Sequence, residues 1–233
     1  MRLLFLISFC LAAAAHAQDY AREARWKSEV VGNLVVGDAV DLRLPSGRTF
    51  LGLYTAGKAQ LPALVIVHGS GVHPDHGVIG SLRVALSDMG FTTLSIQMPV
   101  LAADAPAQDY YPGVFPEAAA RIGGAAAWLR ETHKGRMVLV SHSLGSWMSQ
   151  HYLESAGSVL PFAGWVSLGR SGPVPKLPLP VLDVYGEKDL PAVLASAPER
   201  RAAVQVRIAG ADHFYNGKEA ELAGLLKDFA SGL

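Results

Sequence analysis

Short apolar runs alternate with longer amphipathic stretches through most of this chain. Apolar or alternating runs predict strands at 63–67, 92–97, 137–140, 162–168, 180–185 and 204–208. Two further alternating stretches, at 39–44 and 49–54, predict an antiparallel hairpin at one edge of the sheet. Helical spacing predicts helices at 77–89 and 118–129 and another after residue 143. Because strand and helix alternate, the pattern predicts an α/β fold with a right-handed, doubly wound sheet.

The connections between these elements bear on how a ligand could be covered. Only residues 169–179 separate two of the predicted strands, which is too short a connection for a lid domain. The loop at 99–116 is the other candidate cover. Its Tyr110 and Tyr111 either shape a substrate pocket or pack within an Ω-like loop, and the sequence leaves both readings open.

The amino terminus has the composition of an export signal. Arg2, an apolar core and the small-residue site Ala15-His16-Ala17 predict a secretory signal peptide at 1–17. Its apolar run is too short to span a membrane. Cleavage near Ala17 leaves residues 18–233, which predicts one exported domain, periplasmic or extracellular. The single cysteine, Cys10, lies inside the signal peptide, so the mature chain has no disulfide.

The charges indicate the kind of partner. Lys and Arg number 20 and Asp and Glu number 20, for a formal net charge of zero that shifts to near −1 when Arg2 is removed. No basic cluster is present to neutralise phosphates, and Glu199-Arg200-Arg201 is better explained as a solvated helix end. We therefore expect a small-molecule partner and no nucleic acid, while the oligomeric state is not indicated.

The pentapeptide Ser141-His142-Ser143-Leu144-Gly145 lies between the predicted strand 137–140 and a helical stretch. This is the context of a nucleophile elbow, in which a serine on a strained turn exposes its hydroxyl. Ser143 is therefore the candidate nucleophile. Small flanking residues let the backbone double back. Ser141 replaces the glycine that usually opens this pattern, which weakens the match.

An upstream loop is suited to stabilise negative charge on an acyl oxygen. The predicted strand 63–67 runs directly into His68-Gly69-Ser70-Gly71. Two backbone N–H groups stabilise the alkoxide that forms when a serine attacks an acyl carbon. Leu144 is expected to supply one of them, and Ser70, or else Gly69, the other. The alternative for this loop is an ordinary glycine turn.

The acid of a serine triad is expected after the nucleophile, on a loop beyond the end of a strand. The predicted strand 180–185 leads into Gly186-Glu187-Lys188-Asp189, and Asp189 on that turn is the preferred acid. Asp183, inside the strand, and Glu187, one turn position earlier, are the alternatives.

A histidine follows the acid at the end of the last predicted strand. The run 204–208 opens into the loop that carries His213, the expected general base. Imidazole, with an ordinary pKa of about 6.5, can remove the serine proton and then protonate the leaving group. The carboxylate fixes its tautomer and stabilises the cation. The carboxyl ends of the strands of a doubly wound sheet share one edge, so the triad and Ser70 should meet there.

These motifs carry a resemblance to a known family. The chain resembles the α/β-hydrolase superfamily over nearly all of its mature length, through His68-Gly69, Ser141–Gly145, Gly186–Asp189 and Ala211–His213. The resemblance implies a mostly parallel sheet with helices on both faces. A second resemblance, through His73-Pro74-Asp75 and the segment 94–99, is to a group of exported bacterial hydrolase-like proteins and implies no particular substrate.

Several other residues are candidates for the surroundings of the site. His73, Asp75 and His76 have metal-ligand side chains but no distant partner set, so we expect no metal and assign Asp75 or His76 to capping the helix that follows. Trp128 and Trp147 fall in apolar helical stretches and are assigned to the core. His142 is expected to tether a loop. The expected pocket residues are His68, Tyr110, Tyr111, His142 and Phe214.

The sequence thus predicts an exported serine hydrolase that cleaves a carboxylic ester through an acyl-serine intermediate, with no metal or organic cofactor. The same triad also serves thioesterases, amidases and acyltransferases. An alternative from another class is a non-catalytic envelope binding protein that retains the fold. The departure at Ser141 is the observation that favours it.

Overall fold

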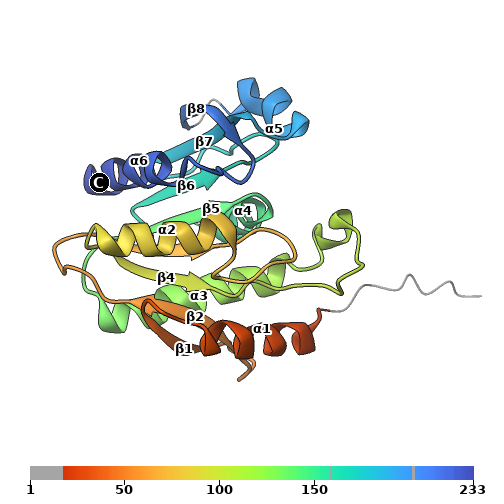
Figure 1. Cartoon of the computed structure of the whole chain (residues 1–233), viewed down its shortest axis with the longest axis vertical. Coiled ribbons are helices and arrows are strands. Elements are labelled where there is room, and N and C mark those ends of the chain that lie inside the picture. The colour runs from red at the N-terminus through yellow and green to blue at the C-terminus, as the bar shows by residue number, and fades with distance from the viewer. Residues whose placement is uncertain (1–17, 158, 201–202) are drawn as a thin grey trace, which may run out of the picture.

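The computed structural model describes residues 18–157, 159–200 and 203–233, in which the strands form a sheet ordered β1-β2-β4-β3-β5-β6-β7-β8 (Figure 1). The expected signal peptide lies outside the described residues. The strands are β1 (Asp38–Arg43), β2 (Thr49–Thr55), β3 (Ala63–Val67), β4 (Thr92–Ile96), β5 (Met137–His142), β6 (Gly164–Leu168), β7 (Val181–Lys188) and β8 (Val204–Asp212). The helices are α1 (Tyr20–Gly32), α2 (Gly77–Asp88), η1 (Ala107–Tyr110), α3 (Phe115–Thr132), α4 (Leu144–Ser155), α5 (Pro191–Ser196), η2 (Ala197–Glu199) and α6 (Glu219–Ser231).

The pairing of the strands confirms the predicted fold class. Strands β1 and β2 form the expected antiparallel hairpin, and β2 runs antiparallel to β4. The remaining neighbours, from β4 through β3 to β8, are all parallel. The sheet is therefore mostly parallel, with its antiparallel part confined to one edge.

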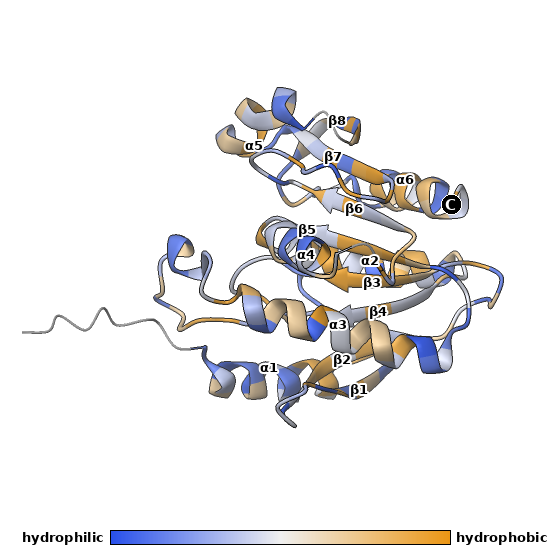
Figure 2. Cartoon of the chain, turned by 180° about the vertical axis from the view of Figure 1, so that it is seen from behind, coloured by the Kyte–Doolittle hydropathy of each residue, from blue (hydrophilic) through white to orange (hydrophobic). Residues whose placement is uncertain are grey.

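Helices cover both faces of this sheet. Figure 1 shows α2 and α6 on one face, and Figure 2, from behind, shows α3 and α4 on the other. All five residues of β3 are buried. Leu64 and Ile66 pack in the core under α2 and α6, whereas Val65 and Val67 pack in the core under α3 and α4. Because both faces of the sheet are covered, β3 is apolar at every position and appears in the sequence as a continuous apolar run.

Helix α1 has no counterpart among the predicted elements. It begins at Asp19, whose carboxylate accepts the backbone N–H of Arg22 at 2.8 Å and so caps the helix. Only Glu23 and Val30 of α1 are buried, so the helix lacks the apolar stripe from which an amphipathic helix is predicted. Val30 packs against Leu53 of β2, which holds α1 beside the antiparallel edge of the sheet.

The connection from β6 to β7 contains neither a helix nor a strand, in agreement with the expected absence of a lid at this point. Among the described residues, no helix is both long enough and apolar enough to cross a membrane. The loops that follow β3, β5, β7 and β8 leave the carboxyl ends of these parallel strands, and the site described below lies there.

One ion pair lies wholly inside the protein beneath α5. Arg200 Nε and Asp183 Oδ2 are 2.6 Å apart, and both side chains are fully buried. Burial raises the pKa of the Asp183 carboxyl, although Arg200 and Gln205 donate hydrogen bonds to it. Such a pair is costly to break because the remaining partner is left charged and without water.

We expect Arg200→Met to lower the free energy of unfolding by about 3–5 kcal/mol, because it leaves the Asp183 carboxylate buried and unpaired. The double variant Asp183→Leu with Arg200→Met should recover most of that loss, since it removes both charges. Urea unfolding gives the free energy of unfolding of the two variants and of the wild type. A double variant no more stable than the single one would contradict the expectation.

Candidate active site

Ser143 lies on a strained turn between β5 and α4. Its φ of 54° and ψ of −123° are outside the conformations that a non-glycine residue normally adopts. The Ser143 N–H donates to the carbonyl oxygen of Leu168 at 2.8 Å, which ties the turn to β6. At Gly145, a Cβ would lie 2.5 Å from the carbonyl oxygen of His68, so only glycine lets α4 begin this close to the end of β3.

Ser141, which replaces the usual first glycine of the elbow, is accommodated inside the sheet. Its side chain is fully buried in β5. The hydroxyl accepts the indole N–H of Trp165 at 2.7 Å and donates to the carbonyl oxygen of Val166 at 3.3 Å. Because both bonds are made with β6, the extra side chain is satisfied without disturbing the turn at Ser143.

The structure brings Ser143, His213 and Asp189 together. His213 Nε2 lies 3.0 Å from Ser143 Oγ, and His213 Nδ1 lies 2.6 Å from Asp189 Oδ1. His213 follows β8 and Asp189 follows β7, at the same edge of the sheet as the serine. With Nδ1–H donating to the carboxylate, Nε2 is left to accept the proton of the serine hydroxyl.

The Asp189 carboxylate is held in its ionised form. Burial alone would raise its pKa, but hydrogen bonds from His213 and from the N–H groups of Gly186 and Leu190 hold the pKa below its usual value. Neither alternative acid contacts His213. Asp183 pairs with Arg200 inside the protein, and Glu187 pairs with Arg207 on the surface.

His68 fixes the loop at 68–71, which follows β3. Its Nε2 accepts the N–H of Met98 at 2.8 Å, so the ring proton lies on Nδ1 and is donated to the Gly69 carbonyl oxygen at 2.7 Å. Burial lowers the pKa of His68 to about 3, which keeps the ring neutral. In a trans peptide the N–H of Ser70 points opposite to the carbonyl of Gly69, so His68 sets the direction of that N–H.

The residues expected to supply oxyanion N–H groups border the serine. Gly69, Ser70 and Leu144 all line the cleft around Ser143. Leu144 is the first residue of α4, so its N–H has no acceptor within the helix. A Cβ at Gly69 would lie 3.2 Å from the Ser143 Cβ, which explains why the loop needs glycine where it passes the serine.

A buried polar chain supports His68 from behind. Gln97, at the end of β4, contacts His68 Nε2 through its amide at 3.1 Å. Arg121 of α3 is fully buried and donates to the Gln97 carbonyl oxygen at 3.0 Å. Its guanidinium also pairs with Glu23 of α1 at 2.9 Å. Sequence analysis misses this chain because its members are polar residues far apart in sequence.

Helix α1 also holds the 68–71 loop directly. Arg22 donates through Nη1 to the carbonyl oxygen of Leu101 at 3.0 Å and through Nη2 to that of Gly71 at 3.2 Å. The guanidinium carbon lies 4.4 Å from the centre of the Trp26 ring, which packs on it from the same helix. One side chain thus joins α1 to two loops next to the serine.

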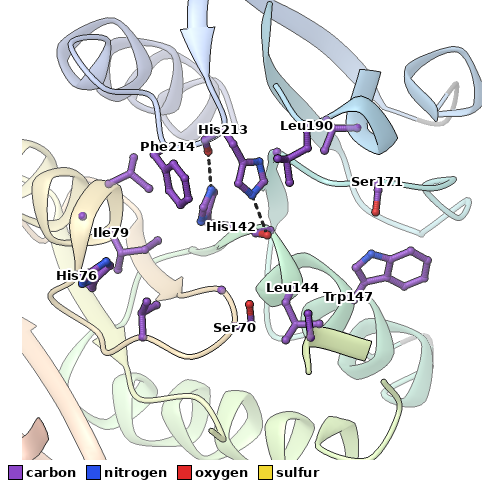
Figure 3. A pocket seen from close by; sticks show the side chains of 18 of the residues that line it. Ser70, His76, Ile79, His142, Leu144, Trp147, Ser171, Leu190, His213 and Phe214 are labelled. Carbon is purple, nitrogen blue, oxygen red and sulfur yellow. Dashed lines mark hydrogen bonds between the residues drawn. The ribbon is translucent and has the colours of Figure 1, made fainter. Parts of the chain in front are cut away.

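Ser143 opens into a cleft of about 540 Å³ (Figure 3). Three of the expected pocket residues, Tyr111, His142 and Phe214, line it. Two do not. His68 lies beneath the loop with both ring nitrogens occupied, and Tyr110 is buried, its hydroxyl accepting the N–H of Leu101 at 3.1 Å. Both alternatives for the loop at 99–116 therefore apply in part. Tyr110 packs inside the loop, and Tyr111 faces the cleft.

His142 has the expected role, whereas Trp147 departs in part from its assignment to the core. His142 tethers the loop after β8 by donating from Nε2 to the His213 carbonyl oxygen at 2.9 Å. Burial, and next the nearby His213, lower the pKa of His142 to about 4. Trp147, which was assigned to the core, packs against it and also lines the cleft. Trp128 packs on Tyr54, with ring centres 5.1 Å apart.

Solved structures of other proteins share the fold of this chain. No protein-family model and no curated protein matches the chain. A dienelactone hydrolase from Anabaena variabilis has a TM-score of 0.66 at 19% identity, over 82% of this chain and 94% of that one. A serine hydrolase without a lid from Xanthomonas campestris has a TM-score of 0.62 at 18% identity, over 83% and 93%. The chain has the α/β-hydrolase fold.

An esterase domain from Rhodothermus marinus shares the same α/β-hydrolase fold, with a TM-score of 0.57 at 14% identity over 83% of this chain and 97% of that one. Identities this low establish the fold and leave the reaction to be argued from the site. In the α/β-hydrolase fold the sequence motifs for nucleophile, acid and base occur in this order along the chain, as they do here.

The cluster of His73, Asp75 and His76 lies beside the cleft of this α/β-hydrolase fold. Asp75 does not cap α2, because its carboxylate pairs with Arg83 at 2.7 Å. His76 occupies the N-cap position but makes no side-chain capping bond. Among the described residues, no three His, Cys, Asp or Glu side chains are close enough together to hold a metal ion. The cluster therefore orders the loop by an ion pair and not by helix capping.

We expect Arg22→Met to slow the reaction of Ser143 with a fluorophosphonate by about tenfold, because the 68–71 loop loses its bond to α1 and small displacements near a reacting atom are costly. Lys27→Met is the matched control, since Lys27 lies on the same helix and pairs with the exposed Asp41 of β1, away from the 68–71 loop. The labelling rates of the two variants, measured by intact mass, test whether Arg22 positions the loop. Equal rates in the two variants would contradict a positioning role for Arg22.

Proposed function

We propose that the protein is a serine hydrolase that cleaves a carboxylic ester through an acyl-serine intermediate. The observation that carries this proposal is the continuous hydrogen-bonded chain from Ser143 Oγ to His213 and on to Asp189, with distances of 3.0 and 2.6 Å. The serine at its end borders an open cleft that Ser70 and Leu144 also line, and their backbone N–H groups are the proposed oxyanion donors. Nucleophile, base, orienting acid and oxyanion donors are all that acyl transfer requires.

Each group has a defined part in the proposed reaction. His213 takes the proton of Ser143 as its oxygen attacks the ester carbonyl carbon. The N–H groups of Ser70 and Leu144 stabilise the alkoxide that forms. The imidazolium then protonates the leaving alcohol as the carbon–oxygen bond breaks, and the acyl group stays on Ser143. Water attacks the acyl-serine by the same route, which releases the acid and restores the serine.

Esters are the preferred substrates for two reasons. The structural neighbours include proteins described as an esterase domain and a dienelactone hydrolase, although their low identity does not transfer a substrate to this chain. The cleft is open and has no lid after β6, which leaves little enclosed surface to grip a peptide. The observation that favoured a non-catalytic binding protein loses its weight, because the Ser141 side chain is satisfied within the sheet.

Export is part of the same proposal. It rests on the signal-peptide pattern of residues 1–17, which lie outside the described residues. The mature enzyme would then be residues 18–233, acting as one domain on a small-molecule ester in the periplasm or outside the cell.

Intact mass after fluorophosphonate treatment tests the proposed nucleophile. We expect one covalent adduct on the wild type and none on Ser143→Ala. His213→Ala should react at least about a hundredfold more slowly, because the base contributes that much to activating a serine. An unlabelled but folded wild type, as judged by circular dichroism, would contradict the proposal and favour the binding protein.

The pH dependence of labelling tests the assignment of the base. Labelling should slow as the pH falls, because a protonated His213 cannot accept the proton of Ser143. His142 is not the source of this slowing, because its pKa of about 4 keeps it neutral above about pH 5. We therefore expect the labelling rate of His142→Gln to depend on pH in the same way as that of the wild type. A profile that becomes flat in that variant would reassign the base to His142.

A further inference from the structure

The cleft extends to both sides of the serine, and its two parts differ in character. Figure 3 shows Trp147 and Leu190 on one side of His213, and Ile79 and Phe214 on the other. We call the first part, with Tyr111, the Trp147 arm. We call the second part, formed by Val78, Ile79 and Phe214, the α2 arm. An ester bound with its carbonyl at Ser143 can place one substituent in each arm.

The wall of the Trp147 arm is fixed in place. The Arg170 guanidinium carbon lies 4.1 Å from the centre of the Trp147 ring and covers one of its faces. Arg170 is itself fully buried and donates to the carbonyl oxygens of Ser146 at 3.2 Å and Pro173 at 2.8 Å. A Cβ at Gly172 would lie 2.9 Å from the ring, so the glycine backbone packs closely against the indole.

A second aromatic ring meets the first at right angles. Tyr111 contacts Trp147 edge to face, with ring centres 5.9 Å apart and planes at 83°. Tyr111 is 41% exposed, so it stands at the mouth of the arm. Two rigid aromatic surfaces at this angle suit a flat ring, which can stack on one and meet the edge of the other. The α2 arm offers the branched aliphatic side chains of Val78 and Ile79 instead.

The cleft also offers a charged substrate no carboxylate, lysine or arginine among the described residues that line it. The nearest charges are not available, since Asp189 is hydrogen-bonded to His213 and Arg170 is covered by Trp147. His142 is neutral at working pH because its pKa is about 4. A carboxylate or ammonium group bound in either arm would lose water without meeting a carboxylate, lysine or arginine, which is costly, although in the α2 arm it would meet the imidazole of His76.

We propose that this cleft selects neutral esters with one flat aromatic substituent, held in the Trp147 arm, and one aliphatic substituent, held in the α2 arm. The inference rests on the proposed function, because it specifies the substrate class of the same site. Trp147 is the specificity-determining residue, and Arg170 acts through it by holding the indole in position.

Two matched substrate pairs test the proposal, since the aromatic group can be on the alcohol or on the acid. Benzyl butyrate is compared with cyclohexylmethyl butyrate, and butyl benzoate with butyl cyclohexanecarboxylate, each rate being divided by that of alkaline hydrolysis. In at least one pair we expect kcat/KM to favour the aromatic ester by about fivefold or more, the scale of aromatic pairing. Benzyl hydrogen succinate, which adds a carboxylate, should react at least about a hundredfold more slowly than benzyl butyrate.

Variants assign the preference to its residue. Trp147→Leu should abolish the aromatic preference, and Trp147→Phe should retain most of it. Trp128→Leu is the matched control, because Trp128 packs on Tyr54 of β2 and does not line the cleft. Circular dichroism and fluorophosphonate labelling of each variant show that the fold and the serine are intact.

The outcomes separate this inference from the proposed function. A wild type that is labelled and prefers an aromatic ester, with loss of preference in Trp147→Leu alone, supports the inference. A labelled wild type without a preference, or with one that survives in Trp147→Leu, overturns the inference and leaves the serine hydrolase intact. Rapid turnover of the charged succinate ester also overturns it. A folded wild type that is not labelled overturns both.

Discussion

The backbone contact between the end of β3 and the turn after β5 determines the geometry of the whole site. Parallel pairing of the two strands sets Val67 beside Ser141, so the segments that leave them run side by side. Glycine at 69 and at 145 lets these segments approach closely. Ser143 and the loop after β3 are thereby positioned by contacts of the main chain. The strain at Ser143 is stored in this contact.

Around this contact the protein buries an unusual amount of polar structure. His68 is neutral and makes hydrogen bonds through both nitrogens, and Arg121 is buried with acidic partners on two helices. Most polar atoms of this network have partners, although Gln97 Oε1 is buried without one. The fixed directions of its hydrogen bonds give the loop after β3 a single conformation, which apolar packing alone does not guarantee.

The sequence predicts the sheet, the lidless connection and the meeting of Ser143, Asp189 and His213, because strand ends in a parallel sheet share one edge. It does not predict α1, whose inward face is polar, nor which neighbouring side chain faces the cleft. Tyr110 and Tyr111 are adjacent yet lie in different environments. Their directions depend on the path of a loop that no local periodicity records. The apolar spacing of its helix likewise predicts only a core position for Trp147, although the side chain also lines the cleft.

The bonds from Arg22 span 79 residues of sequence to Leu101 and 49 to Gly71. Contacts of such long range form late when a chain folds, because closing a long loop carries an entropic cost before other contacts offset it. The loop beside the serine therefore gains its bond to α1 through a contact between segments far apart in the sequence. A chain in which Ser143, Asp189 and His213 had met before α1 docked would have this loop without its bond from Arg22.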